Sequence, residues 1–230
     1  MSEKLNFPRK PPPPFDYIPP DTPLEIIFKD DHLLVLSKPS GLLSVPGRKE
    51  EHQDCLINRV QLEYPNARTV HRLDMDTSGV VIMAMNSNSH RNLGLQFEKR
   101  KTKKEYIARI WGDIEGENGH IDLPLICDWP NRPLQKIDLT RGKDARTDWK
   151  VLEREEDGKF TRVSLSPITG RTHQLRVHMA EIGHPILGDD FYAHERAFKA
   201  ESRLQLHAKS LMVYHPEDRR EMWFEAPCPF

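Results

Sequence analysis

Apolar and polar residues alternate with the period of a β-strand over much of the chain. Two short apolar runs, 24–28 and 32–38, flank Asp30-Asp31 and predict a β-hairpin. Two alternating segments flank Asp157-Gly158, a dipeptide that favours a tight hairpin turn. Further strands are predicted for 79–85, 104–112, 204–216 and 221–230. Hairpins of this kind predict a mixed, largely antiparallel sheet.

Three stretches follow helical spacing instead. Apolar residues recur at steps of about four in 52–64, which Pro65 would end. A second helix is predicted from a Ser87 or Ser89 cap to about residue 101, and a third from a Thr172 cap to Gly183. Segment 121–136 is rich in proline and predicts a long loop with short extended pieces. Isolated helices among hairpins, without βαβ alternation, predict an α+β fold.

Composition narrows the class of protein. The chain of 230 residues has a Pro-rich segment 1–22, predicted to be a flexible or surface-draped tail, and 23–230 remain for folded structure. No apolar run reaches the roughly 18 residues of a membrane span, and no signal peptide is recognisable, which predicts a cytoplasmic protein. The three cysteines are widely separated, and His173 and His178 are spaced by five, so no metal site is expected.

Charge is balanced overall but unevenly distributed. The formal net charge is −1, whereas nucleic-acid-binding proteins usually carry a clear excess of basic residues. Locally, "FEKRKTKKEY" concentrates basic residues and "GRTHQLRVH" adds more: Lys99, Arg100, Lys101, Lys103, Lys104, Arg171 and Arg176. Such clusters could neutralise phosphates or could form a solvated face. No phosphate-binding glycine loop, dinucleotide fingerprint or nucleophile elbow is present.

The stretch "HRLDMDTSG" (71–79) places Asp74 and Asp76 beside Arg72, directly before the apolar run 80–85. It could be a turn with an ordinary surface salt bridge, or a catalytic carboxylate on a loop held by a rigid sheet. Taken alone, Tyr106 could equally be a half-buried strand residue, and Arg176 a surface charge on a helix.

Taken together, these motifs resemble the RluA family of pseudouridine synthases. "DDHLLVLSKPSGLLSVPG", "HRLDMDTSG", "KKEY", "GRTHQLRVHMAEIGHPILGDDFY" and "LQLHAKSLMVYHP" occur in the order of that family's motifs, over roughly residues 24–230. The segments "LLSVPGR" and "LICDWPNRPLQK" are most similar to the dual-specificity member, which modifies 23S ribosomal RNA and the anticodon stem-loop of certain tRNAs. No additional RNA-binding S4 domain, which many relatives carry, is expected in this chain.

The resemblance implies a pseudouridine synthase fold with flanking helices and a central active-site cleft in one catalytic domain, 23–230. It implies isomerisation of uridine without cofactor or metal. Asp74 would be the catalytic carboxylate, and Arg176 the cation paired with it. Tyr106 would be the aromatic that stacks on the target base, and it is also a proposed acceptor of the C5 proton. Arg72 would contact RNA or fill the space of an extruded base. The basic residues Lys99, Arg100, Lys101, Lys103, Lys104 and Arg171 are predicted to hold phosphates.

Two other functions remain open at this point. An RNA-binding or ribosome-assembly protein could keep the fold without the chemistry, although intact Asp74, Tyr106 and Arg176 argue against it. A hydrolase could use Asp74 and Asp76 as an acid/base pair. Glycoside hydrolysis needs two carboxyl groups that face each other across the bond, about 5 to 9.5 Å apart, and two residues spaced by two in a turn need not do so. A monomer is expected, and the role of Asp76 is open.

Overall fold

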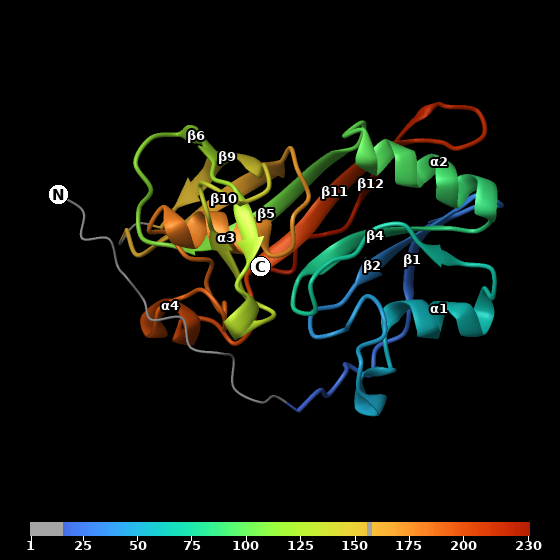
Figure 1. Ribbon diagram of the computed structural model, residues 1–230, viewed down its shortest axis with the longest axis horizontal. Helices are drawn as coiled ribbons and strands as arrows, with labels where there is room; N and C mark the ends of the chain where they lie inside the picture. Colours follow the sequence, from blue (N-terminus) through green and yellow to red (C-terminus); the bar gives the residue numbers. More distant parts are fainter. Residues whose placement is uncertain (1–15, 156–157) are drawn as a thin grey trace. The chain divides into compact units, whose positions relative to one another are not determined.

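The computed structural model describes residues 16–155 and 158–230, so most of the predicted tail lies outside the described residues (Figure 1). The chain forms two compact units. The first unit combines Asp16–Tyr106 with the C-terminal His207–Phe230, and the second comprises Ile107–Leu206. The chain passes from the first unit to the second within strand β5 (Lys103–Trp111) and returns within β11 (Leu206–Tyr214).

The first unit is built on a sheet of hydrogen-bonded strands in the order β1-β2-β4-β11. Its strands are β1 (Glu25–Lys29), β2 (Leu33–Lys38), β3 (Arg68–Thr69), β4 (Ser78–Ala84), β11 and β12 (Glu221–Glu225). The pairings β1–β2, β2–β4, β3–β4 and β11–β12 are antiparallel, while β4 and β11 are parallel. The expected mixed, largely antiparallel sheet is confirmed.

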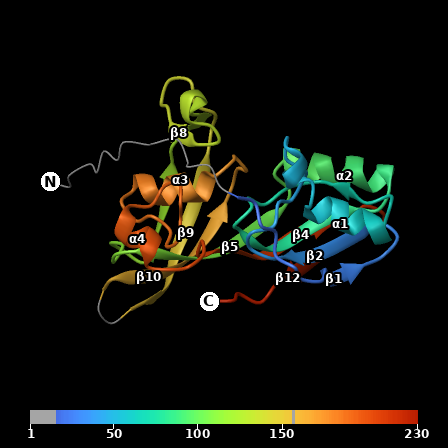
Figure 2. The same cartoon turned by 90° about the horizontal axis from the view of Figure 1, so that it is seen from below.

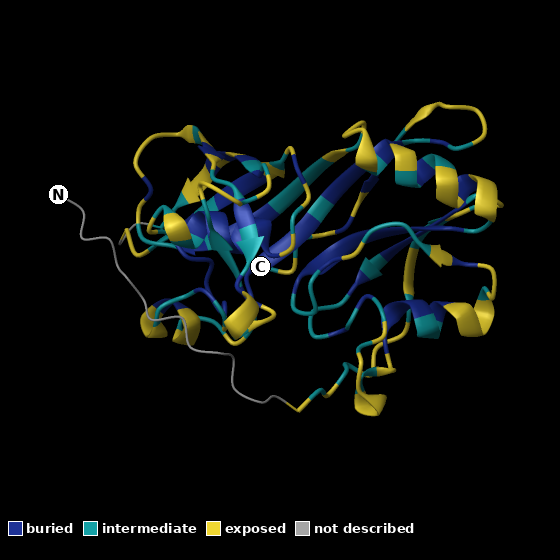
Figure 3. Ribbon diagram, in the orientation of Figure 1, coloured by how far each residue is buried: buried dark blue, intermediate teal, exposed yellow. Residues whose placement is uncertain are grey.

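Two strands at the centre of this sheet are buried on both faces. Every residue of β4 is buried, and so are most residues of β2 (Figure 3). Leu34 and Val81 point into one core cluster, whereas Val35 and Ile82 point into another. Such a strand has no polar face, and this explains why residues 80–85 form a continuous apolar run rather than an alternating one.

One helix supports each of these clusters. Helix α1 (Leu56–Glu63) contributes Leu56 and Val60 to the first cluster, and α2 (Ser87–Glu98) contributes Leu93 and Phe97 to the second. The cap of α2 differs from the prediction. Its N-cap is Asn86, whose extended backbone lets the side chain accept a hydrogen bond from the backbone N–H of Ser89 (2.9 Å), a bond that Ser87 inside the helix cannot replace.

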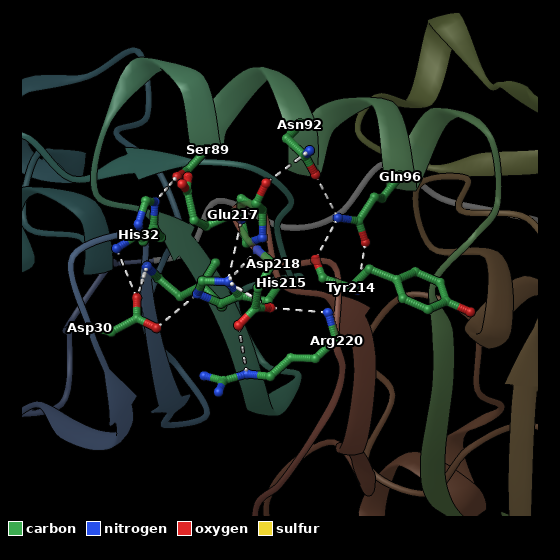
Figure 4. Close-up of polar contacts among 12 residues, drawn as sticks. Asp30, His32, Ser89, Asn92, Gln96, Tyr214, His215, Glu217, Asp218 and Arg220 are labelled. Atoms are coloured by element: carbon green, nitrogen blue, oxygen red, sulfur yellow. Dashed lines mark hydrogen bonds and ion pairs between the residues drawn. The ribbon is translucent and has the colours of Figure 1, made fainter.

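A polar network fixes α2 to the turns at one end of the sheet (Figure 4). Asp30 accepts hydrogen bonds from the backbone of His32 and from Nε2 of His215 (3.0 Å), while Nδ1 of His32 contacts the Ser89 hydroxyl (3.2 Å). Further along the helix, the Gln96 amide donates to the backbone carbonyl of Tyr214 and accepts from its N–H. The helix therefore leads into the basic run 99–104 from a fixed position in this unit.

The second unit contains β6 (Asn118–Asp122), β7 (Leu125–Cys127), β8 (Gln135–Ile137), β9 (Arg146–Arg154), β10 (Phe160–Pro167), α3 (Gln174–Glu181) and α4 (Glu195–Lys199). Strands β10, β9 and β6 are hydrogen-bonded in that order and antiparallel, and β7–β8 form a separate hairpin. Helix α3, seen from below in Figure 2, contributes Val177 to a core cluster whose other buried members are Leu125, Leu134, Ala145 and Tyr192. The predicted β9–β10 hairpin is confirmed, although Asp157 lies outside the described residues.

Several local features were not predicted correctly. Helix α3 starts after His173, in the left-handed region at φ 53°, and not at a Thr172 cap. The His173 ring is buried and contacts the Tyr192 hydroxyl (2.6 Å), so tertiary packing sets this start. The sequence also gave no signal for β3 or for α4. Among the described residues, no helix is long and apolar enough to cross a bilayer.

Candidate active site

Asp74 lies in the loop between β3 and β4, in the first unit. The loop closes as a turn in which the Asp74 carbonyl accepts a hydrogen bond from the Thr77 backbone N–H (3.2 Å). The side chain of Asp74 is half-buried, whereas its neighbour Leu73 is buried in the core cluster under α1. The buried Leu73 side chain thus anchors the loop directly beside Asp74.

The preceding loop, 38–44, binds the backbone on both sides of Asp74. The Ser44 hydroxyl donates to the Leu73 carbonyl (2.7 Å) and accepts from the Leu73 N–H (3.2 Å). The Ser40 hydroxyl donates to the Asp76 carbonyl (2.7 Å). Because these bonds use main-chain atoms, they hold the loop in place without occupying the Asp74 carboxylate.

Lys38 completes this attachment. Its side chain is 0% exposed, and its ammonium donates to the carbonyls of Pro39, Leu42 and Met75 at 2.6 to 2.8 Å. The Met75 carbonyl also accepts from the Gly41 N–H (3.0 Å). A buried ammonium has three protons, and here three carbonyls satisfy them. Lys38 is thus a structural cation under the loop that carries Asp74.

We expect Lys38→Met to destabilise the protein by about 2 to 4 kcal/mol, because one buried and two part-buried carbonyls would lose a charged donor. Urea unfolding followed by circular dichroism measures this change. The exposed Lys150 provides a matched control, and Lys150→Met should change the unfolding free energy by less than about 0.5 kcal/mol. Equal stability of the two variants would contradict the structural role of Lys38.

The other end of the loop is fixed by a close contact with β11. Gly79 has φ +113°, and a Cβ built on it would lie 2.2 Å from the Ala208 carbonyl oxygen. The adjacent Ser78 hydroxyl contacts Nδ1 of buried His207 (2.9 Å), whose Nε2 contacts the Ala226 carbonyl (3.1 Å). Gly79, the last residue of HRLDMDTSG, is therefore required because the backbone of β11 leaves no room for a side chain.

His71 holds the start of the loop as a neutral ring. Its Nε2 accepts a hydrogen bond from the Ile82 backbone N–H (3.0 Å), and the ring stacks on Phe97 at 4.7 Å between centroids. Burial and the positive charge of Lys104 lower the pKa of His71 to about 3. A ring nitrogen that accepts cannot carry a proton, so the geometry and the lowered pKa agree.

The structure brings Tyr106 and Asp74 together within the first unit. Tyr106 is half-buried and packs against the core cluster that contains Leu42 and Leu73. Burial, together with the negative charge of Asp74, raises the pKa of Tyr106 well above its usual range. Both effects disfavour the phenolate. The Tyr106 hydroxyl therefore keeps its proton at neutral pH and can act as a hydrogen-bond donor.

Arg176 lies in the second unit, on α3, and is 2% exposed. Its guanidinium binds both carboxylate oxygens of buried Asp189, at 2.8 and 2.6 Å, and contacts Asp190 at 2.9 Å. Burial alone would raise the pKa of Asp189, but Arg176 and the backbone N–H groups of Phe191 and Tyr192 bring it below its usual range. The pairing of Arg176 with Asp74 stays a prediction.

The predicted RNA-contact residues fall in different environments. Arg72 is exposed on the Asp74 loop, and the run after α2 exposes Lys99, Arg100, Lys101 and Lys103. Lys104 is half-buried, and burial with the nearby Arg100 lowers its pKa to about 8. Arg171, in the second unit, is half-buried and donates to the Asp144 carbonyl (2.9 Å). The exposed members lie at the surface, whereas Arg171 has a role within its own unit.

Comparison with known proteins adds a decisive observation to this geometry. The family model described as RNA pseudouridylate synthase matches residues 32–181, which include Asp74, Tyr106 and Arg176. The chain belongs to this family.

Curated relatives of this RNA pseudouridylate synthase are similar over nearly the whole chain. The dual-specificity RNA pseudouridine synthase RluA of Yersinia pestis is 55% identical over 205 residues, covering 89% of this chain and 99% of the relative. RluA of Escherichia coli strain K12 is 53% identical over 216 residues, covering 94% and 98%. Among solved structures, human RNA Pseudouridylate Synthase Domain Containing 1 has a TM-score of 0.76 and 28% identity, covering 93% of this chain and 87% of that one. The α+β fold with a large, mostly antiparallel sheet is that of this synthase family.

Several residues that shape the synthase site were missed by sequence reasoning. Lys38, Ser40 and Ser44 lie in "KPSGLLS", and His71 and His207 lie in other quoted motifs, but no individual role was assigned to them. The signal that could have found Lys38 is a lysine at the end of a continuous apolar strand, a position that requires hydrogen-bond partners. The hydroxyls gave no comparable signal, because serine is common in any loop.

Proposed function

We propose that this pseudouridine synthase isomerises specific uridines in both 23S ribosomal RNA and the anticodon stem-loop of tRNA. The observation that carries the proposal is the identity of 55% and 53%, over almost full length, to proteins named dual-specificity RNA pseudouridine synthases. The two compact units would act as one catalytic domain spanning 23–230, in a cytoplasmic monomer. RNA is the only partner that the proposal requires.

In the reaction, the bond between uracil N1 and ribose C1′ breaks, the base turns, and C5 bonds to C1′. The C5 proton leaves and N1 gains a proton, so that the product is an isomer of uridine. We propose Asp74 as the catalytic carboxylate. It could attack the sugar, attack the base or remove a ribose proton, and each route needs the ionised form held in a fixed position. The hydrogen bonds from 38–44 to the loop backbone supply the position.

Tyr106 is proposed to stack on the target base and to donate a hydrogen bond to it. The raised pKa of Tyr106 argues against a role as a general base, because a neutral phenol already carries its proton. Acceptance of the C5 proton by Tyr106 would require the phenol proton to pass to another acceptor, and the Asp74 carboxylate is the nearby anion that affects its pKa. Stacking and donation fit the observed environment more directly.

The remaining proposed roles concern charge and access. Arg176 would favour the ionised form of Asp74, for which an always-charged guanidinium is suited. A paired base reaches an enclosed site only after extrusion, which needs a few kcal/mol, and Arg72 would fill the vacated space. Lys99, Arg100, Lys101, Lys103, Lys104 and Arg171 would contact phosphates.

We expect Tyr106→Phe to lower the single-turnover rate about 10- to 100-fold, since the ring that stacks is kept and the hydroxyl is lost. Rapid-quench measurement of pseudouridine formation gives this rate. RNA affinity, measured by fluorescence anisotropy, should change less than twofold. A rate equal to that of the wild type would limit Tyr106 to stacking.

The proposed function is tested by tritium release from RNA labelled at uridine C5. A transcribed tRNA and a fragment of 23S ribosomal RNA are incubated separately with wild-type protein, and the positions of pseudouridine are mapped in each. Release from both RNAs supports dual specificity, and release from one limits the function to that RNA. Folded protein that binds both RNAs without release would instead indicate a binding or assembly role.

A further inference from the structure

An exposed tryptophan stands on a short loop of the second unit, between β7 and β8. Trp129 is 65% exposed and begins the single helical turn Trp129–Asn131. The guanidinium of Arg132 lies over its ring, 4.4 Å from the ring centroid. Figure 2 shows this turn, in yellow-green beside the β8 label, projecting from the rest of its unit. A large aromatic surface is thus held in solvent with a cation beside it.

The loop that carries this ring is firmly built. Asp128 is 6% exposed, and its carboxylate accepts from the Asn131 amide (2.9 Å) and pairs with Lys136 (3.2 Å). Its backbone N–H donates to the carbonyl of Leu134, which is 1% exposed and packs in the core of the unit. The position of Trp129 is therefore fixed by a buried aspartate and an anchored leucine. Such preorganisation lowers the entropy lost when a ligand binds.

The charges around the ring suit a polyanion. In segment 128–144 the charged side chains that are exposed are all cationic: Arg132, Arg141 and Lys143. The three aspartates of the segment, Asp128, Asp138 and Asp144, are buried or half-buried and are paired with neighbouring cations or backbone groups. A phosphate chain that passes over this surface meets exposed cations next to an aromatic ring that is 65% exposed.

We propose that Trp129 is a stacking platform for an unpaired nucleotide of the substrate RNA, with Arg132 contacting the same base or its phosphate. Exposed aromatic rings with adjacent arginines bind single-stranded RNA in this way, because every base has a π face and every nucleotide a phosphate. The proposal rests on the proposed function and adds a docking point outside the residues assigned to catalysis. Stacking reads no particular base, so the platform gives affinity and register.

The test compares binding and turnover of full-length variants on one RNA that the wild type modifies. We expect Trp129→Ala to weaken binding in fluorescence anisotropy, and to raise KM, by about 5- to 150-fold. The value of kcat should change less than twofold, and Trp129→Phe should recover most of the loss. Leu139→Ala is the matched control, because Leu139 is 77% exposed in the same basic segment but has no π face, and it should bind like the wild type.

Abasic replacement at single positions of the RNA locates the stacked nucleotide. At that position, loss of the base should weaken binding to the wild type but not to Trp129→Ala, since the two changes remove the same contact. Wild-type affinity of Trp129→Ala, or equal effects of every abasic position on both proteins, would overturn the platform. An RNA that the wild type binds but does not convert would count against the proposed function for that RNA, and the binding comparison would still decide the role of Trp129.

Discussion

Replacement of Asp74 by asparagine is expected to abolish turnover, with a loss of at least about 1,000-fold in the single-turnover rate. Asparagine has nearly the same shape as aspartate but cannot act as a nucleophile or a base. The loop should remain in place, because its attachments use the backbone of Leu73, Met75 and Asp76. Tritium release from labelled RNA and rapid-quench kinetics measure the loss.

Two controls make this result specific. The unfolding free energy of Asp74→Asn should stay within about 1 kcal/mol of the wild type, and RNA affinity should be largely retained. Asp76→Asn is the matched variant, since it removes a carboxylate from the same turn. A much smaller loss for Asp76→Asn would assign the chemistry to Asp74, whereas persistent activity of Asp74→Asn would remove Asp74 from its role.

Replacement of Arg176 by methionine should have the second large effect, on stability as well as on activity. The buried Asp189 would lose its bidentate partner, and removal of one member of a buried ion pair destabilises a protein by about 3 to 5 kcal/mol. If Arg176 also favours the ionised form of Asp74, catalysis should fall about 100-fold or more in the remaining folded protein. Urea unfolding and single-turnover rates on the folded fraction measure the two effects separately.

A double variant separates the structural role of Arg176 from its proposed effect on catalysis. Arg176→Met with Asp189→Asn removes both buried charges, and it should recover much of the stability lost in the single variant. Activity should stay low in the double variant if Arg176 acts on Asp74. Recovery of both stability and activity would make Arg176 a structural residue. Lys99→Met removes an exposed cation and should lower activity far less than Arg176→Met.

The pair also predicts a dependence of stability on pH. The pKa of Asp189 is lowered in the folded protein, so the pair contributes stability above the unfolded pKa of aspartate, about 3.9. That contribution is lost as the pH falls through the lower, folded pKa. Acid unfolding of the double variant should therefore lack this component of the wild-type transition.

Local sequence signals were sufficient for most elements. The alternation in β5 identified a strand because side chains in a strand point to opposite faces in turn. The apolar run of β4 identified a strand that is buried on both faces. Pro65 correctly marked a limit for α1, which ends at Glu63. The caps at Asn86 and His173 were missed, since several polar residues compete at each position and packing selects one. The five-residue helix α4 has too few turns to show a period.

The sequence by itself determined the family, because several motifs stand in the family's order along the chain. The same motifs identified Asp74 and Tyr106 as candidate site residues. The tertiary structure alone decided what surrounds them. It placed Ser44 and Lys38 against the Asp74 loop, and it left Tyr106 half-buried near the Asp74 carboxylate, where burial and the negative charge raise the pKa of the phenol. It also buried Asp189 beneath Arg176 while leaving Trp129 in solvent. The burial of a side chain and the identity of its hydrogen-bond partners depend on residues that are far apart in the sequence. These residues come into contact only when the chain folds.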